Sequence, residues 1–221
     1  MLRDAALVAA KDLRVEARSR VATNQVLPFA VMVLVLFGFA LDPDRGVLGR
    51  ASAGLFWVTV LFAAVLAVQR SFALEADETR DALRLSGLDD AGIFLGKAAA
   101  VAVQLLLLEA VLAVGVAVLF DVTLRGVALL ALVCLLATVG VASAGIVYGV
   151  VAAGLRVRET LLPLLVLPVV APVLLAATRA SEAALGGAAV DAWPWVRLLV
   201  VFATIYTVFG VVAFGPLLEE S

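Results

Sequence analysis

Histidine is absent from the 221 residues, and cysteine occurs once, at Cys134. Without histidine the chain lacks the commonest metal ligand and general base, and a single cysteine builds neither a disulfide framework nor a paired-cysteine motif. Charged side chains make up only 15% of the residues and the net charge is −2, which excludes a generally basic nucleic-acid binder. The absence of histidine also removes the commonest haem ligand, and we expect no nucleic acid among the partners.

Apolar side chains dominate what is present. Hydrophobic residues make up 65% of the chain, and the mean hydropathy of +1.17 is too high for a soluble domain of this length. We therefore expect an all-α membrane protein with six transmembrane helices and one domain over residues 1–221. The expected spans are residues 26–41, 52–68, 98–120, 126–153, 161–177 and 196–214. Short turns at 42–52 and 121–125 and a longer loop at 178–194, with a short helix near residues 181–185, should join the outer ends of these spans.

The first 25 residues differ from the spans because apolar and charged residues alternate at helical spacing. Leu2, Ala6, Ala10, Leu13 and Ala17 recur on one face, with basic residues among the polar positions. This pattern predicts an amphipathic helix that lies at the membrane interface. The stretch has no uninterrupted apolar core, so we expect no cleaved signal peptide.

Residues 69–97 form the only long polar interruption between apolar segments. Six acidic and four basic residues fall in this stretch. The pattern of residues 74–85 predicts a short surface helix with charge pairs three residues apart. It should end at Ser86-Gly87, where the glycine can take the left-handed conformation that terminates a helix. Asp89 or Asp90 should then cap the next helix. A polar helix that lies across the ends of two spans is suited to docking a partner protein that exerts force on it. The alternative is a solvated loop that only connects the two spans. The docking residues that we predict are Glu75, Asp77, Glu78, Thr79, Arg80, Asp81, Leu83, Arg84, Leu85, Ser86, Gly87 and Leu88.

Basic residues are distributed unevenly between the two sides of the expected topology. Eleven of the sixteen Lys and Arg residues fall in the N-terminal segment and in the loops at 69–97 and 154–160, and five fall on the opposite side. By the positive-inside rule, the first set is cytoplasmic, and so are both termini.

Two glycine-containing stretches resemble catalytic motifs only superficially. Gly92 and Gly96 precede Lys97, but three residues separate the glycines where a phosphate-binding loop has four, and Ala98 replaces its Ser or Thr. We expect Lys97 instead to extend towards the lipid headgroups. The stretch around Ser143 lacks the spacing of a nucleophile elbow. The chain is therefore predicted not to be an enzyme, and any ATP hydrolysis should occur in a separate subunit.

Several residues inside the expected spans are candidates for function or packing. Glu109 falls near the middle of the bilayer, where a carboxylate is functional by default, or is a packing residue satisfied by Gln104 or by a nearby hydroxyl. Small residues in the fourth span should allow close helix packing, and three prolines should kink the fifth. The packing set is Gly140, Ala144, Gly145 and Gly149, and the kinks are at Pro163, Pro168 and Pro172. Haem ligation could come only from Met1, Met32, Cys134, Tyr148 or Tyr206, for which core roles are simpler.

The order of these parts resembles the permeases of type-2 ABC exporters, and most of all the heme exporter protein B, or cytochrome c maturation protein B, family. The matching runs are KDLRVEARSR at residues 11–20, GLFWV at 54–58, GK at 96–97, LLPLLVLP at 161–168 and PVL at 172–174. Together they spread over nearly the whole chain.

The resemblance implies a multi-pass permease of the bacterial inner membrane that acts in haem handling for c-type cytochrome biogenesis. It further implies a cytoplasmic ABC ATPase that binds ATP and magnesium, two permease copies, other cytochrome c maturation membrane proteins and a periplasmic haem chaperone. Haem is then the ligand handled by the complex. The sequence departs from this family at residues 98–101, which lack its His-Trp. Two alternatives stay open: export of a lipid, polysaccharide or drug by a type-2 permease, and a membrane scaffold that transports nothing.

Overall fold

The described part of the chain is helical. The computed structural model describes residues 1–19, 22–41, 45–73, 87–153 and 158–220, and no strand occurs within these ranges. The elements are α1 (Leu2–Ser19), a π-helical turn η1 (Ala22–Val26), α2 (Leu27–Ala40), α3 (Arg45–Ala73), α5 (Asp90–Leu119), α6 (Val127–Ala153), α7 (Arg158–Leu185) and α8 (Ala189–Glu220). The predicted all-α membrane fold is confirmed at this level.

Five of these helices, α3, α5, α6, α7 and α8, are long and apolar enough to cross a membrane. The helix α2 has only 14 residues, which at a rise of about 1.5 Å per residue gives roughly 21 Å, less than a bilayer core. It passes the same test only together with α1, from which it is bent by 55°. The chain is thus a multi-pass membrane protein with five clear crossings and a shorter sixth candidate.

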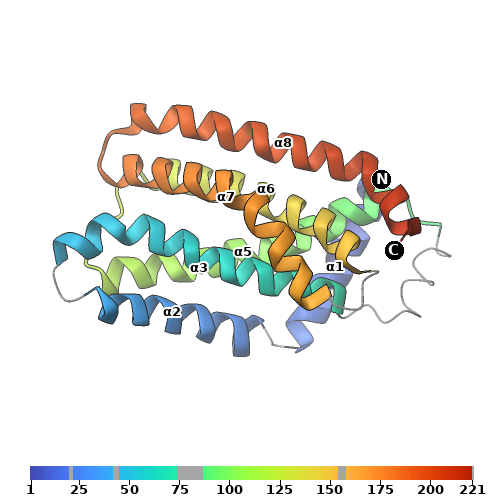
Figure 1. Ribbon diagram of the computed structural model, residues 1–221, viewed down its shortest axis with the longest axis horizontal. Helices are drawn as coiled ribbons and strands as arrows, with labels where there is room; N and C mark the ends of the chain where they lie inside the picture. Colours follow the sequence, from blue (N-terminus) through green and yellow to red (C-terminus); the bar gives the residue numbers. More distant parts are fainter. Residues whose placement is uncertain (20–21, 42–44, 74–86, 154–157, 221) are drawn as a thin grey trace.

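The long helices run side by side along the longest axis of the molecule. Figure 1 shows α8 and α7 above α3 and α5, with α2 along the lower edge and α1 at one end. The N- and C-terminal marks lie together at that same end, hereafter the terminal end of the bundle. The first turns of α5 also lie there. The terminal end therefore contains α1, both termini and the beginning of α5.

The polar turn predicted just before the second span is helical from residue 45 onward. Residues 45–52 were expected in a polar turn, but α3 already begins at Arg45 and has 29 residues. Leu48 and Ser52 are buried, and Ser52 Oγ donates to the carbonyl of Gly49 at 2.8 Å. Packing of this first part of α3 outweighs the low helix propensity of its glycines.

The expected long loop at residues 178–194 is also absent. The helix α7 continues to Leu185 and α8 begins at Ala189, so only three residues join them, including Gly187 with φ +78°. Ser181, predicted to be on the outside, is buried and accepts a hydrogen bond from Trp57 Nε1 of α3 at 3.0 Å. The polar residues here mark one exposed helix face, where Arg179 pairs with Glu182 at 3.1 Å, rather than a loop.

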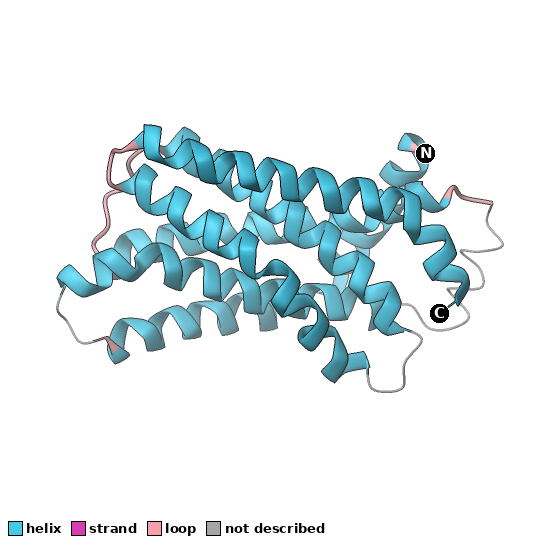
Figure 2. Cartoon of the chain, turned by 45° about the horizontal axis from the view of Figure 1, so that its top comes forward, coloured by secondary structure: helices cyan, strands magenta, loops and turns pink. Residues whose placement is uncertain are grey.

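The predicted prolines lie inside α7, and the predicted small residues of α6 lie in close contacts between helices. Pro163, Pro168 and Pro172 lie inside α7, whose course bends in both Figure 1 and Figure 2. A proline removes one backbone hydrogen bond, which permits such a bend. The small residues of α6 face neighbouring helices: Gly140 packs on Phe202 of α8, Gly145 on Val68 and Gly149 on Phe72 of α3, and Ala144 is fully buried.

Candidate functional site

The predicted docking helix lies almost entirely outside the described residues, because only Gly87 and Leu88 of its set are described. Two predictions at its end can be compared with the structure, and both are confirmed. Gly87 adopts a left-handed conformation with φ +67°. Asp89 caps α5, and its side chain accepts a hydrogen bond from the backbone N–H of Gly92 at 3.2 Å. The conformation of Gly87 and the Asp89 cap therefore define the backbone directly after residue 86.

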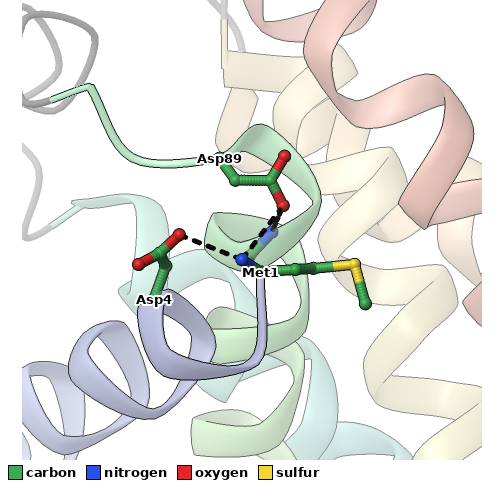
Figure 3. Close-up of polar contacts among 4 residues, drawn as sticks. Met1, Asp4 and Asp89 are labelled. Carbon is green, nitrogen blue, oxygen red and sulfur yellow. Dashed lines mark hydrogen bonds and ion pairs between the residues drawn. The ribbon is translucent and has the colours of Figure 1, made fainter.

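The first turn of α1 lies directly beside this cap. Figure 3 shows the Met1 ammonium between two carboxylates, Asp4 of its own helix at 3.1 Å and Asp89 of α5 at 3.8 Å. The hydrogen bond from this ammonium holds the pKa of Asp4 below its ordinary value. These exposed ion pairs add little stability but place α1 in register with the start of α5.

Two glycines of α5 allow α1 to approach its backbone closely. A Cβ on Gly92 would lie 2.9 Å from the Met1 carbonyl oxygen, and one on Gly96 would lie 2.6 Å from Val8 Cβ and 2.7 Å from the Ala5 carbonyl oxygen. Spacing of four residues puts both glycines on one face of α5. The stretch that resembled a phosphate-binding loop is thus a helix-packing face for α1.

Two ion pairs continue this contact beyond the glycines. Asp12 lies 3.9 Å from Lys97 of α5, and Glu16 accepts a hydrogen bond from Arg70 Nε of α3 at 2.8 Å. Arg70 also donates to Ser19 Oγ at 2.8 Å. Because Arg70 and Lys97 come from the two helices that flank residues 74–86, α1 is held to both sides of that segment.

The expectation that Lys97 reaches the lipid headgroups is wrong. Lys97 is 2% exposed, and its ammonium lies 5.4 Å from the centre of the Phe72 ring in addition to facing Asp12. An ammonium so deeply buried requires compensation by opposite charge and by the ring face. Asp12 Oδ2 is itself buried without a hydrogen bond among the described residues. Lys97 therefore belongs to the attachment of α1 rather than to the bilayer surface.

A second polar centre lies deeper, where α5 meets α6. Glu109 is 2% exposed and its Oε1 accepts a hydrogen bond of 2.5 Å from Thr138 Oγ1, while Cys134, one turn earlier on α6, also faces the carboxyl. Its second oxygen has no hydrogen-bond partner within the described ranges. The hydrogen-bond partner of Glu109 is thus a hydroxyl, which is one of the two alternatives that we predicted. The other alternative, Gln104, faces a different part of the bundle.

Gln104 faces a cleft between α1, α3 and α5. It lines two adjoining cavities of about 140 and 270 Å³, which share Glu16, Ala67 and Arg70. The smaller cavity is bordered by charged residues, and the larger one by apolar side chains of α1, α2, α3 and α5. The two intramembrane candidates therefore belong to different sites, although they are only five residues apart.

The residues considered for haem ligation do not converge. Tyr148 and Tyr206 form a tilted ring pair with centres 6.5 Å apart between α6 and α8, whereas Cys134 faces Glu109 and Met32 is exposed on α2. No group of three acidic or cysteine residues suited to a metal ion occurs in the part of the chain that the structure describes.

Sequence reasoning missed the pairing of Glu16 with Arg70 and the role of Phe94. Both members of that ion pair were visible as charges at span ends, but 54 residues separate them and no local pattern links them. Phe94 is fully buried and packs over Gly210 of α8, with its ring 5.7 Å from that of Phe214. A glycine inside an apolar span was the available signal for such a close contact.

The chain is similar to known proteins over nearly all of its described length. The family model described as CcmB protein matches residues 3–220. A heme exporter protein B of Paracoccus denitrificans is 31% identical over 179 residues, which cover 80% of this chain and 82% of that protein. Proteins with the same name from Haemophilus influenzae (29%, covering 79% of each chain) and Pseudomonas aeruginosa (28%, covering 94% of each) are also similar. The chain, a multi-pass protein of the bacterial inner membrane, belongs to the CcmB protein family.

Proposed function

We propose that this chain is the permease subunit of an ABC transporter complex that handles haem during c-type cytochrome biogenesis. The observation that carries the proposal is the family match over residues 3–220, whose similar members are named heme exporter protein B. In this proposal residues 1–221 form one type-2 permease domain. ATP and magnesium bind a separate cytoplasmic subunit, and haem is the ligand that the complex handles rather than a cofactor of this chain.

The proposed topology has six spans with both termini in the cytoplasm. The five long helices and the bent α1–α2 pair supply the crossings, and eleven of the sixteen basic residues fall in the N-terminal segment and in the stretches at 69–97 and 154–160. Residues 75–88 then face the cytoplasm and dock the ATPase. On the opposite side, the short connections would meet the periplasmic haem chaperone and other cytochrome c maturation membrane proteins. Two permease copies would complete the membrane part.

The attachment of α1 suggests how force on residues 75–88 reaches the membrane helices. Arg70 near the end of α3 and Lys97 near the start of α5 are both tied to α1, by Glu16 and Asp12. A push on the segment between them would therefore move α3, α5 and α1 together rather than bend one loop. Because α1, α3 and α5 would move as one unit, a movement on the cytoplasmic side would be transmitted to the membrane helices that pack against them.

The test is the content of c-type cytochromes after deletion of the gene for this chain. We expect loss of haem-stained c-type cytochromes and recovery with the wild-type chain. Normal c-type cytochromes after deletion would contradict the proposal and favour a type-2 exporter of a lipid, polysaccharide or drug. Retained function with a catalytically inactive ATPase partner would instead favour a scaffold that transports nothing.

Docking by residues 75–88 is tested separately. Charge reversal at Arg80 and Arg84 should lower the amount of ATPase that co-purifies with the chain, whereas reversal at Arg179, on the opposite end of the bundle, should not. Equal co-purification of the ATPase with both variants would contradict the docking role while leaving the haem-handling proposal in place.

A further inference from the structure

The cleft beside α1 has one polar end and one apolar end. Its larger cavity, of about 270 Å³, is bordered by Leu27 of α2, Ala63 of α3 and Leu105, Leu107 and Val111 of α5. Leu107 and Val111 are 66% and 47% exposed, so the cavity has an apolar rim at its outer edge. Seven residues separate Gln104 from Val111, which corresponds to about 10 Å along the helix. The apolar lining residues thus extend along α5 for about two turns, and we refer to this part of the cleft as the apolar channel.

Gln104 stands where the two cavities join. It is half-buried, and its side-chain amide makes no hydrogen bond with any residue that the structure describes. An amide at this depth has little water to bond with, and an unpaired polar group in an apolar environment costs free energy. Its two N–H donors and one carbonyl acceptor are therefore suited to a ligand in the cleft.

The smaller cavity, of about 140 Å³, carries both signs of charge. Lys11 and Arg70 supply cations, and Asp12 and Glu16 supply carboxylates. Among the described residues, Arg70 uses two of its five N–H donors, for Glu16 and Ser19. A ligand group with one sign of charge would meet repulsion from half of these side chains, whereas a zwitterion can face an opposite charge at each end.

We propose that this cleft is a binding site for one phospholipid with a zwitterionic, primary-ammonium headgroup, as in phosphatidylethanolamine. The phosphate faces Arg70 and Lys11, the ammonium faces Asp12 and Glu16, and Gln104 bonds to the ester region below. One acyl chain fills the apolar channel past Leu105 and Leu107. A choline headgroup fits less well because its trimethylammonium has no N–H to donate to the carboxylates, and a glycerol headgroup leaves them without a cation.

The test uses the full-length chain, together with any subunits that co-purify, exchanged into bilayers of equal parts phosphatidylethanolamine, phosphatidylcholine and phosphatidylglycerol. After extraction in a mild detergent, native mass spectrometry counts the lipids that remain bound to each chain. We expect one retained phosphatidylethanolamine. Gln104→Leu should lower its occupancy about fivefold, the usual effect of one lost hydrogen bond to a ligand. Ala17→Trp should lower it as well, because Ala17 is exposed at the rim of the larger cavity and a ring there enters the channel.

Matched controls distinguish the cleft from the general lipid surface. Val103→Leu adds apolar volume next to Gln104 on the exposed side of α5, and Leu7→Trp adds a ring on the exposed face of α1 outside both cavities. Both should retain the lipid as the wild type does. Equal retention in all variants, equal loss in the controls, or retention of phosphatidylcholine, phosphatidylglycerol or haem in place of phosphatidylethanolamine would overturn the assignment. The result is independent of c-type cytochrome content, so it separates this site from the proposed function.

Discussion

At the residue scale, Glu109 is the most unusual group in the bundle. It is buried between α5 and α6, and one hydroxyl and one thiol of α6 face its carboxyl. A charged carboxylate at mid-bilayer depth is costly, so its local partners decide whether the helix pair tolerates it. The Thr138 hydroxyl is then part of what keeps α5 and α6 together.

Removal of the Thr138 hydroxyl should therefore matter only while Glu109 is present. We expect Thr138→Val to lower the free energy of unfolding in bicelles, and the coupling to Glu109→Leu in a double-mutant cycle to be about 0.6–1.7 kcal/mol. Steric-trap unfolding of the four variants measures this coupling. Thr59→Val is the matched control, because Thr59 is equally buried but donates only to the Leu55 carbonyl of its own helix. A coupling near zero for Thr138 would mean that Glu109 is held by other groups.

At the element scale, the attachment of α1 to α5 depends on the absence of side chains at two positions. Gly92 and Gly96 bring the helix backbones close enough for Val8 to be 2% exposed, and the ion pairs of Asp12 and Glu16 extend the contact. Hence α1 is an integral part of the terminal end, packed into the bundle along one face while Leu2 and Leu7 on its other face stay exposed.

Gly96→Leu should detach α1, because the new side chain would overlap Val8 and the backbone of Ala5. Overpacking of this kind costs about 1–3 kcal/mol, which raises the detached fraction about five- to hundredfold. In a chain with Cys134→Ala and Val8→Cys, labelling by a water-soluble maleimide reports that fraction. Gly49→Leu is the control, since nothing lies within 4 Å of a Cβ at Gly49. Similar labelling rates in the two variants would contradict the role of Gly96.

A second contact between elements joins α5 to α8. Gly210→Ala places a methyl group against the buried Phe94 ring, so we expect destabilisation despite the higher helix propensity of alanine. Phe94→Leu should remove most of this cost by shortening the side chain, which thermal denaturation of the single and double variants would measure. Gly54→Ala, whose Cβ would meet only Thr178 at 3.9 Å, should be neutral or stabilising. If the effects of Gly210→Ala and Phe94→Leu on thermal stability simply add in the double variant, the contact between the two residues is contradicted.

How well the sequence predicted each element depended on whether the determining contacts are local. The all-helical class, the left-handed Gly87 and the Asp89 cap follow from hydropathy and from residues a few positions apart, and all three are confirmed. The beginning of α3 and the end of α7 were misplaced because buried residues such as Ser52 and Ser181 look polar in sequence. Their partners lie on the same turn or on another helix. The same limit explains Lys97, whose burial depends on Asp12 and Phe72, far away in the chain.

At the scale of the whole molecule, the two ends of the bundle differ in character. The terminal end holds α1, both termini and the ion pairs around Arg70 and Lys97. The other end has tight connections, with Gly126 at φ +62° before α6 and Gly187 at φ +78° before α8. Short turns leave little to move there, so rearrangements driven from the cytoplasm would be expressed mainly at the terminal end and along the helices attached to it.

This difference predicts which residues water-soluble reagents reach from each side of the membrane. In a Cys134→Ala chain, cysteines introduced at Thr123 and Ala188, both exposed on the short connections, should react with a membrane-impermeant maleimide in intact cells with a permeabilised outer membrane. A cysteine at Arg3, exposed on α1, should react only after the inner membrane is opened. The reason is the proposed orientation, in which the segments with eleven of the sixteen basic residues, and with them the N-terminus, face the cytoplasm. Labelling of residue 3 in intact cells, or protection of residues 123 and 188, would reverse the orientation, and with it the side from which an ATPase could act on α1, α3 and α5.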